Sequence, residues 1–181
     1  TDLLQMHKAD LLPPHILDPK AHLKSASGYF ELEMFQQADR ELRALPNEEP
    51  WLKKKKVFQL AIRQEVQDWK GMGTLARELR TECPNEEEWW VSDAYATRRS
   101  ETIDEAKRIL LDGLAVHYES AIIRYNLACY FCVLGQLEEC IDFLKEAVLR
   151  DDKYKLMAFE DEDLKKIRET LLKLGWGGGI V

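Results

Sequence analysis

The sequence lacks the features that would point to a membrane, a nucleic acid or a catalytic site. No apolar run among its 181 residues approaches the roughly 20 that a helix needs to cross a bilayer. It has no glycine-rich phosphate loop, no nucleophile motif and no convergent set of histidines and carboxylates. The 26 basic residues are outnumbered by 33 acidic ones, for a net charge of −7, whereas nucleic-acid binding requires a basic face. We therefore expect no membrane insertion, no nucleic-acid binding and no enzymatic activity.

Cysteine is scarce, and the four that occur do not have the spacing of a metal site. Cys129 and Cys132 lie within a predicted helix, whereas structural zinc sites need four ligands and usually present thiolates on turns. The histidines show no ligand spacing with them. Buried cysteine is common as a small apolar packing residue, and we prefer that interpretation to the alternative of a metal or redox pair. We expect no metal and no cofactor. Unpaired thiols are typical of reducing compartments, which favours a cytoplasmic location.

What the sequence does contain is a pattern that returns every 34 residues. Within residues 124–152, apolar side chains follow the three- and four-residue spacing of two amphipathic helices. Gly135 lies between them, at a position suited to a left-handed helix end. Small residues in two columns of the repeat indicate where paired helices approach closely. The four columns are Ala128, Ala94, Leu60 and Ala26; Cys140, Ala106, Met72 and Ala38; Leu137, Ile103, Trp69 and Phe35; and Leu144, Leu110, Ala76 and Leu42.

A helix–turn–helix unit of this period resembles the tetratricopeptide-repeat (TPR) family. The resemblance implies an all-α fold, a right-handed superhelical stack of antiparallel helix pairs. It covers residues 19–154 as four TPR-like repeats, with bounds 19–52, 53–86, 87–120 and 121–154. The fourth repeat matches the family pattern best, at Tyr125, Leu127, Ala128, Phe131, Gly135, Leu137 and Ala147.

Individual helix ends carry recognisable capping signals. Asp18 precedes Pro19, which suits a capping residue followed by proline at the first helical position. Thr102 is followed three residues later by Glu105, the pattern of a capping box. At Glu101 this chain departs from the family, where glycine is usual, but the 34-residue period is unbroken.

Two segments flank the repeats. Residues 1–18 are predicted to be an N-terminal lead-in, in which Pro13-Pro14 prevents one continuous helix. Its apolar residues are candidates for packing across the first helix pair: Leu3, Leu4, Leu11, Leu12, Ile16 and Leu17. Residues 155–181 are predicted to form a C-terminal capping helix and a flexible tail. The helix is expected to start at Asp161 or Asp163 and to carry Leu164, Ile167, Leu171 and Leu172.

The resemblance also implies a function, that of a protein-interaction scaffold or adaptor. TPR proteins hold a peptide or helix of a partner protein in a concave groove lined by the first helix of each pair. Two neighbouring arginines in an acidic protein favour a partner segment that carries carboxylates. The alternative for these side chains is packing and pairing between repeats. The alternative for the whole chain is a structural role, in which repeats self-associate into a homodimer or larger assembly. The candidate groove residues are Lys24, Phe58, Tyr95, Arg98, Arg99, Tyr125 and Asn126.

Overall fold

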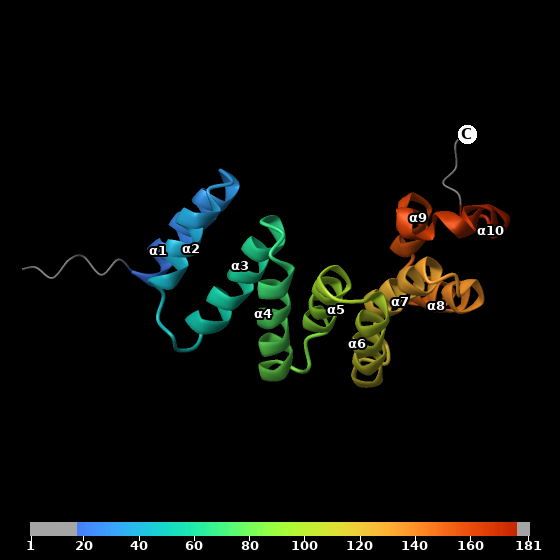
Figure 1. The fold of residues 1–181 in the computed structure, drawn as a ribbon, viewed down its shortest axis with the longest axis horizontal. Coiled ribbons are helices and arrows are strands. Elements are labelled where there is room, and N and C mark those ends of the chain that lie inside the picture. The colour runs from blue at the N-terminus through green and yellow to red at the C-terminus, as the bar shows by residue number, and fades with distance from the viewer. Residues whose placement is uncertain (1–17, 177–181) are drawn as a thin grey trace, which may run out of the picture. The chain divides into compact units, whose positions relative to one another are not determined.

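The computed structural model describes residues 18–176, and every regular element among them is a helix (Figure 1). The fold is therefore all-α, as predicted. Most of the predicted N-terminal lead-in (residues 1–17) and the end of the predicted tail (residues 177–181) lie outside the described residues. Within residues 18–176, no helix combines the length and the apolar character that a membrane span needs.

Eight of the helices come in four consecutive pairs, each pair joined by a turn of two or three residues. One pair falls in each predicted repeat range, except that the third helix begins at Trp51, two residues before the predicted second repeat. The repeat boundaries themselves stay a prediction. The pairs are α1 (Pro19–Glu31) and α2 (Phe35–Arg43); α3 (Trp51–Glu65) and α4 (Trp69–Glu82); α5 (Glu88–Ser100) and α6 (Ile103–Val116); and α7 (Ala121–Val133) and α8 (Leu137–Arg150).

The chain divides into two compact units, and the division falls inside α3, between Ile62 and Arg63. In the first unit, α1, α2 and the part of α3 up to Ile62 enclose a small core with aromatic rings packed against it. In the second unit, the helices α4 to α8 pack each against the next along the chain. Their larger core is continuous from α5 to the C-terminal elements.

The predicted helix crossings are confirmed by burial. Ala26, Ala94 and Ala128 are completely buried, as are Ala38 and Ala106 of the second column. A small side chain at each of these points lets the paired backbones approach closely, because a protein interior is packed without room for extra methylene groups. Both capping predictions are also confirmed. The Asp18 carboxylate accepts the N–H of Lys20 at 3.1 Å, and the Thr102 hydroxyl accepts that of Glu105 at 3.2 Å.

The C-terminal region differs from the prediction of one capping helix. It forms α9 (Lys153–Glu160), a 3₁₀ helix η1 (Glu162–Ile167) and α10 (Arg168–Lys173), which we call the C-terminal cap. The helical conformation is interrupted at Asp161, whose backbone is extended. Its carboxylate caps η1 by accepting the N–H of Asp163 at 2.9 Å. Leu164, Ile167 and Leu171 are buried as expected, in part against α7, whereas Leu172 is exposed.

The turn between α7 and α8 has the expected left-handed residue. Gly135 adopts φ +80°. Its N–H bonds back to the carbonyl of Cys132 at 3.0 Å, and the N–H of Gln136 bonds to that of Phe131 at 2.9 Å. This is the Schellman arrangement, which satisfies carbonyls at the helix end and is easiest for glycine to adopt.

Earlier repeats place larger residues in the same left-handed conformation. Glu33 and Gln67, which occupy the column of Gly135, both have φ +57°. The left-handed region costs a residue with a side chain about 1–2 kcal/mol. Glu101, in the same column, avoids it with φ −135°. The first two turns therefore carry backbone strain that the third and fourth do not.

Replacing Gln67 by glycine should therefore stabilise the protein. We expect Gln67→Gly to raise the free energy of unfolding by about 0.5–1 kcal/mol, since the relief of strain exceeds the extra entropy that glycine loses on folding. Denaturant unfolding measures the change. Glu101→Gly is the matched control: with no positive φ to relieve, it should be neutral or destabilising. Equal gains from both substitutions would contradict the strain at Gln67.

Candidate functional site

The predicted groove residues lie on the first helices of the pairs, in both units. Lys24 is exposed on α1, and Phe58 is partly buried on α3. The Phe58 ring packs edge-on against Phe30, with the centroids 5.5 Å apart. The other five candidates belong to the second unit, on α5 and α7.

Phe58 also lines an apolar groove of about 620 Å³ in the first unit. Leu23 of α1 forms one wall, and Val57, Phe58 and Ala61 of α3 form the other. Three charged residues, Glu49, Lys53 and Lys54, also line this groove beside its aliphatic and aromatic surface. We call it the α1–α3 groove.

Arg98 is already bound to an acidic residue of the C-terminal cap. Its guanidinium makes a two-pronged ion pair with Asp163, in which Nη2 donates to Oδ1 at 2.8 Å and Nη1 donates to Oδ2. Two parallel charge-assisted bonds of this kind are strong and directional. The bond to Asp163 raises the pKa of Arg98, and the guanidinium also lies 5.2 Å from the centroid of the Tyr130 ring. Arg98 thus holds the cap against α5.

Tyr125 binds the neighbouring acidic residue of the cap. Its hydroxyl donates to Oδ2 of Asp161 at 2.8 Å. Its ring stacks on that of Tyr154 in α9, with the centroids 4.6 Å apart. Burial raises the pKa of Tyr125, so the hydroxyl keeps its proton and remains a hydrogen-bond donor. Two of the predicted groove residues, Arg98 and Tyr125, therefore engage two carboxylates of the same chain.

Cys129 completes this group, and together with the two aspartates it offers three potential metal ligands. The Cys129 thiol donates to Oδ2 of Asp161 at 3.6 Å, and one ligand atom from each of Cys129, Asp161 and Asp163 lies within 4.8 Å of the others. However, burial and the Asp161 charge raise the pKa of the Cys129 thiol well above its usual value, whereas metals bind the thiolate. A cation here would also have to displace the Arg98 guanidinium. The absence of a bound metal stays a prediction.

Arg99, next along α5, is exposed and lies on aromatic rings. Its guanidinium carbon is 3.4 Å from the centroid of the Tyr95 ring and 5.1 Å from that of Trp69, the first residue of α4. The two rings meet edge-on at 5.8 Å. We call Trp69, Tyr95 and Arg99 the Arg99 cluster. Nη1 of Arg99 also donates to the backbone carbonyl of Tyr95 at 3.4 Å. A guanidinium has five N–H donors, so the others remain able to bind a carboxylate.

Asn126 is directed back to its own helix. Its side-chain N–H donates to the carbonyl of Ile122 at 2.9 Å, one turn earlier in α7. The structure thus places Arg98 and Tyr125 against the cap, and Tyr95 with Arg99 in the Arg99 cluster. Sequence analysis missed Trp69 as a site residue because it lies on the second helix of its pair and was assigned to an apolar packing column.

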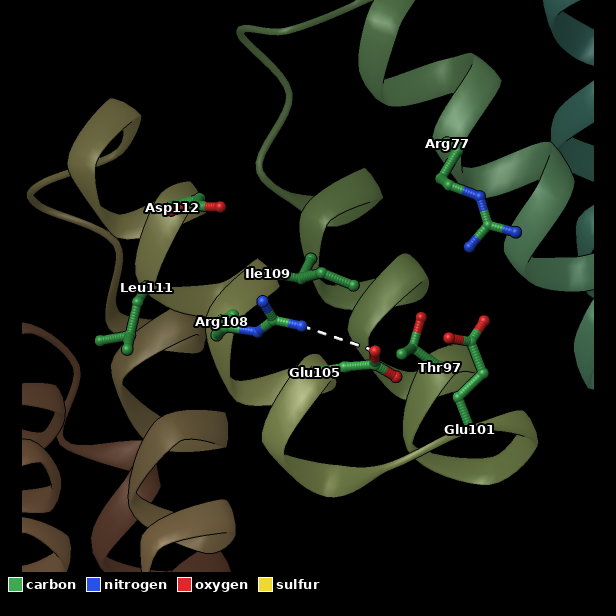
Figure 2. Close-up of a pocket in the computed structure, with 8 residues that line it drawn as sticks. All are labelled: Arg77, Thr97, Glu101, Glu105, Arg108, Ile109, Leu111 and Asp112. Carbon is green, nitrogen blue, oxygen red and sulfur yellow. Dashed lines mark hydrogen bonds and ion pairs between the residues drawn. The ribbon is translucent and has the colours of Figure 1, made fainter.

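The second unit also has a hollow, of about 390 Å³, which is lined by charged side chains (Figure 2). It lies among α4, α5 and α6, and includes Arg77, Thr97, Glu101 and Arg108. Arg108 pairs with Glu105 at 3.5 Å, and Arg77 pairs with the buried Asp93 at 3.2 Å. Its charges are thus largely matched within the protein, which distinguishes it from the exposed Arg99 cluster.

Asp93, the partner of Arg77 in this pair, is a completely buried residue of α5. Arg77 and Arg80 approach it to 3.2 and 3.1 Å, and Thr97 donates to its Oδ1 at 3.4 Å. Although Arg80 is within ion-pair distance of Oδ2, that oxygen accepts no well-directed hydrogen bond. Burial raises the pKa of Asp93, and the two arginines only partly oppose this. Keeping the Asp93 carboxylate charged therefore costs folding free energy, and the ion pairs with α4 recover only part of that cost.

The Arg98–Asp163 pair should contribute to stability through a measurable coupling. Arg98→Ala, Asp163→Ala and the double variant form a cycle, for which we expect a coupling of about 1 kcal/mol in denaturant unfolding. Arg99→Ala combined with Asp163→Ala is the control, because Arg99 stacks on Tyr95 instead; these changes should be additive. Additive effects in both cycles would mean that the ion pair does not hold the cap.

Asp93 should make stability depend on pH. Because its folded pKa is raised above the ordinary 3.8, the stability it contributes is fully present below its unfolded pKa and declines as the pH rises through the folded value. Asp93→Asn removes this titration. Denaturant unfolding should show wild type losing stability relative to Asp93→Asn as the pH rises above about 4. A relative gain would show that Arg77 and Arg80 outweigh burial.

Comparison with known proteins identifies the fold alone. No family model matches this sequence, and no curated protein matches it. A crystal structure of MamA is 12% identical, with a TM-score of 0.63 over 86% of each chain. MamA from Desulfovibrio magneticus RS-1 is 16% identical, with a TM-score of 0.60 over 88% of this chain and 96% of that one. A Bacteroides ovatus protein with a provisional protein-binding description is 12% identical, with a TM-score of 0.50 over 87% of this chain and 98% of that one. This chain is thus similar in fold to solved helical proteins of low sequence identity.

Proposed function

We propose that this chain is a non-enzymatic, cytoplasmic TPR-type adaptor that binds an acidic segment of a partner protein beside α5. The observation that supports the proposal is that side chains of α5 and α7 bind acidic residues of the same chain. Arg98 and Tyr125 already hold Asp163 and Asp161. A surface that binds carboxylates within the chain has the donors and charge to bind carboxylates from another protein.

The Arg99 cluster is the part of this face that is open to a partner. Arg99 is exposed, and its stacking on Tyr95 and Trp69 limits the conformations that it would lose on binding. Arginine and aromatic side chains are also the residues that most often dominate binding energy at protein interfaces.

The remaining predicted residues have different places in this proposal. Arg98 and Tyr125 bind the C-terminal cap, and Asn126 is engaged with its own helix. Lys24 and Phe58 lie in the first unit and are not part of the site proposed beside α5. The similar fold of a protein described as protein-binding is consistent with a scaffold role.

Self-association is the second candidate function. Leu149 of α8 is 79% exposed, and Leu156 and Met157 of α9 are 58% and 45% exposed. Large apolar side chains at this end of the second unit would favour contact with another copy of the chain. Light scattering distinguishes this role from that of an adaptor, since a self-associating protein gains mass with concentration without any added partner.

The adaptor proposal predicts that Arg99 governs binding of acidic peptides. In fluorescence anisotropy, a set of Asp/Glu-rich peptides should bind, whereas the same peptides with Lys in place of the acidic residues should not. Arg99→Ala should weaken binding by about 1–2 kcal/mol without altering helix content, and added salt should weaken it in wild type.

The matched control for this experiment is Arg108→Ala. Arg108 is also exposed, but it lies on α6 and is paired with Glu105. Loss of binding in the Arg108 variant equal to that in Arg99→Ala would indicate a general effect of net charge. Acidic peptides that bind Arg99→Ala as well as wild type would show that the Arg99 cluster is not the binding site.

A further inference from the structure

The α1–α3 groove of the first unit presents an apolar surface without a described occupant. Its volume of about 620 Å³ lies within the range of roughly 300–1,000 Å³ for sites that enclose small ligands or side chains of a partner. Leu23, Val57, Phe58 and Ala61 line it with aliphatic and aromatic groups. Apolar side chains placed here would leave water, which is the main favourable term in association.

The edge of the groove adds a charge preference. Lys53 and Lys54, in the first turn of α3, border it, and Glu49 is the one acidic residue among the lining side chains. Lys54 is exposed, with its ammonium 5.1 Å from the centroid of the Trp51 ring. An occupant should therefore combine large apolar residues with an adjacent carboxylate.

The chain itself carries this chemistry immediately before α1. The triplet Asp-Leu-Leu occurs twice in the first 17 residues, as Asp2-Leu3-Leu4 and as Asp10-Leu11-Leu12. In each, an acidic residue directly precedes a pair of leucines. This is the combination that the groove and its lysines would accept.

The point where the described structure begins lies close to the groove. Asp18 caps α1, and Leu23 in the groove wall is five residues later, about 7.5 Å along the helix axis. Leu12 precedes Asp18 by six residues, a stretch that spans up to about 20 Å when extended. The second triplet is therefore within reach of the groove. A short tether also gives the triplet an effective concentration in the millimolar range.

We propose that the segment of residues 1–17 docks into the α1–α3 groove of its own chain, with Leu11 and Leu12 inserted between α1 and α3 and Asp10 beside Lys54. Phe58 then packs against the chain's own N-terminal segment, and a partner protein is left with the Arg99 cluster. The inference is independent of partner binding at Arg99, because it concerns the first unit alone.

Thiol labelling in the full-length chain tests the proposal. Ala61→Cys places a reactive thiol in the groove, in a chain whose half-buried Cys83 is replaced by serine; Cys129, Cys132 and Cys140 are buried. A docked segment should make labelling by a maleimide about tenfold slower than in the same chain carrying Leu11→Ser and Leu12→Ser. Circular dichroism confirms that each variant is folded.

Two controls address the residues involved. Leu3→Ser with Leu4→Ser removes an identical leucine pair and should leave the groove protected, since the second triplet is the one that docks. Asp10→Lys should speed labelling, and combining it with Lys54→Glu should restore protection, because the charge pair is then reversed.

Three results would overturn the proposal. The first is equal labelling rates with and without Leu11→Ser and Leu12→Ser. The second is protection that rises with protein concentration, which would mean that the segment enters the groove of a second copy. The third is full reactivity of the intact chain with protection only by an added free peptide of residues 7–14, which would make the groove a site for a partner protein.

Discussion

Two helices pack closely only where the side chain at their crossing is small, and this chain meets that requirement once in almost every repeat. Ala26, Ala94 and Ala128 are completely buried at equivalent positions. With the backbones this close, the larger apolar residues on either side of each crossing interdigitate and exclude water. A helix pair of this kind cannot bury its apolar face alone, so each depends on its neighbours. The positions of the closest helix contacts thus follow from the 34-residue period of the sequence.

Within the described residues, α8 is followed by the C-terminal cap rather than by another pair of this length. The apolar side chains of the cap extend the core of the second unit, while Asp161 and Asp163 bind polar groups on α5 and α7. The cap therefore uses two kinds of interaction. Leu164, Ile167 and Leu171 remove apolar surface from water, and the ion pair with Arg98 adds a directional contact. This also explains why a face predicted to bind acidic segments is partly filled by the chain itself.

Local patterns predicted most of the fold because its signals are local. The helix pairs, the caps at Asp18 and Thr102 and the left-handed Gly135 each depend on residues within a few positions of one another. The Arg98–Asp163 pair could not be predicted in this way, because 65 residues separate its members and a charge pattern does not identify a distant partner. Asp161, one of the two predicted starts of the C-terminal helix, does cap the element that follows it, but the short helix α9 before it was not predicted. The candidate residues were placed correctly on first helices, but their partners depend on the tertiary fold.

The ion pair between Arg98 and Asp163 also constrains where a further helix pair could be inserted. It joins the cap to α5, which belongs to the third helix pair, while Tyr125 joins the cap to α7 of the fourth pair. The cap therefore contacts two successive pairs. Another pair inserted between α8 and α9 would move the aspartate away from its arginine and from the hydroxyl of Tyr125. The added pair would need its own equivalents of both residues before the end could close. Lengthening this protein by duplication is thus most readily achieved on the N-terminal side of α5, where the contacts that terminate the stack are left intact.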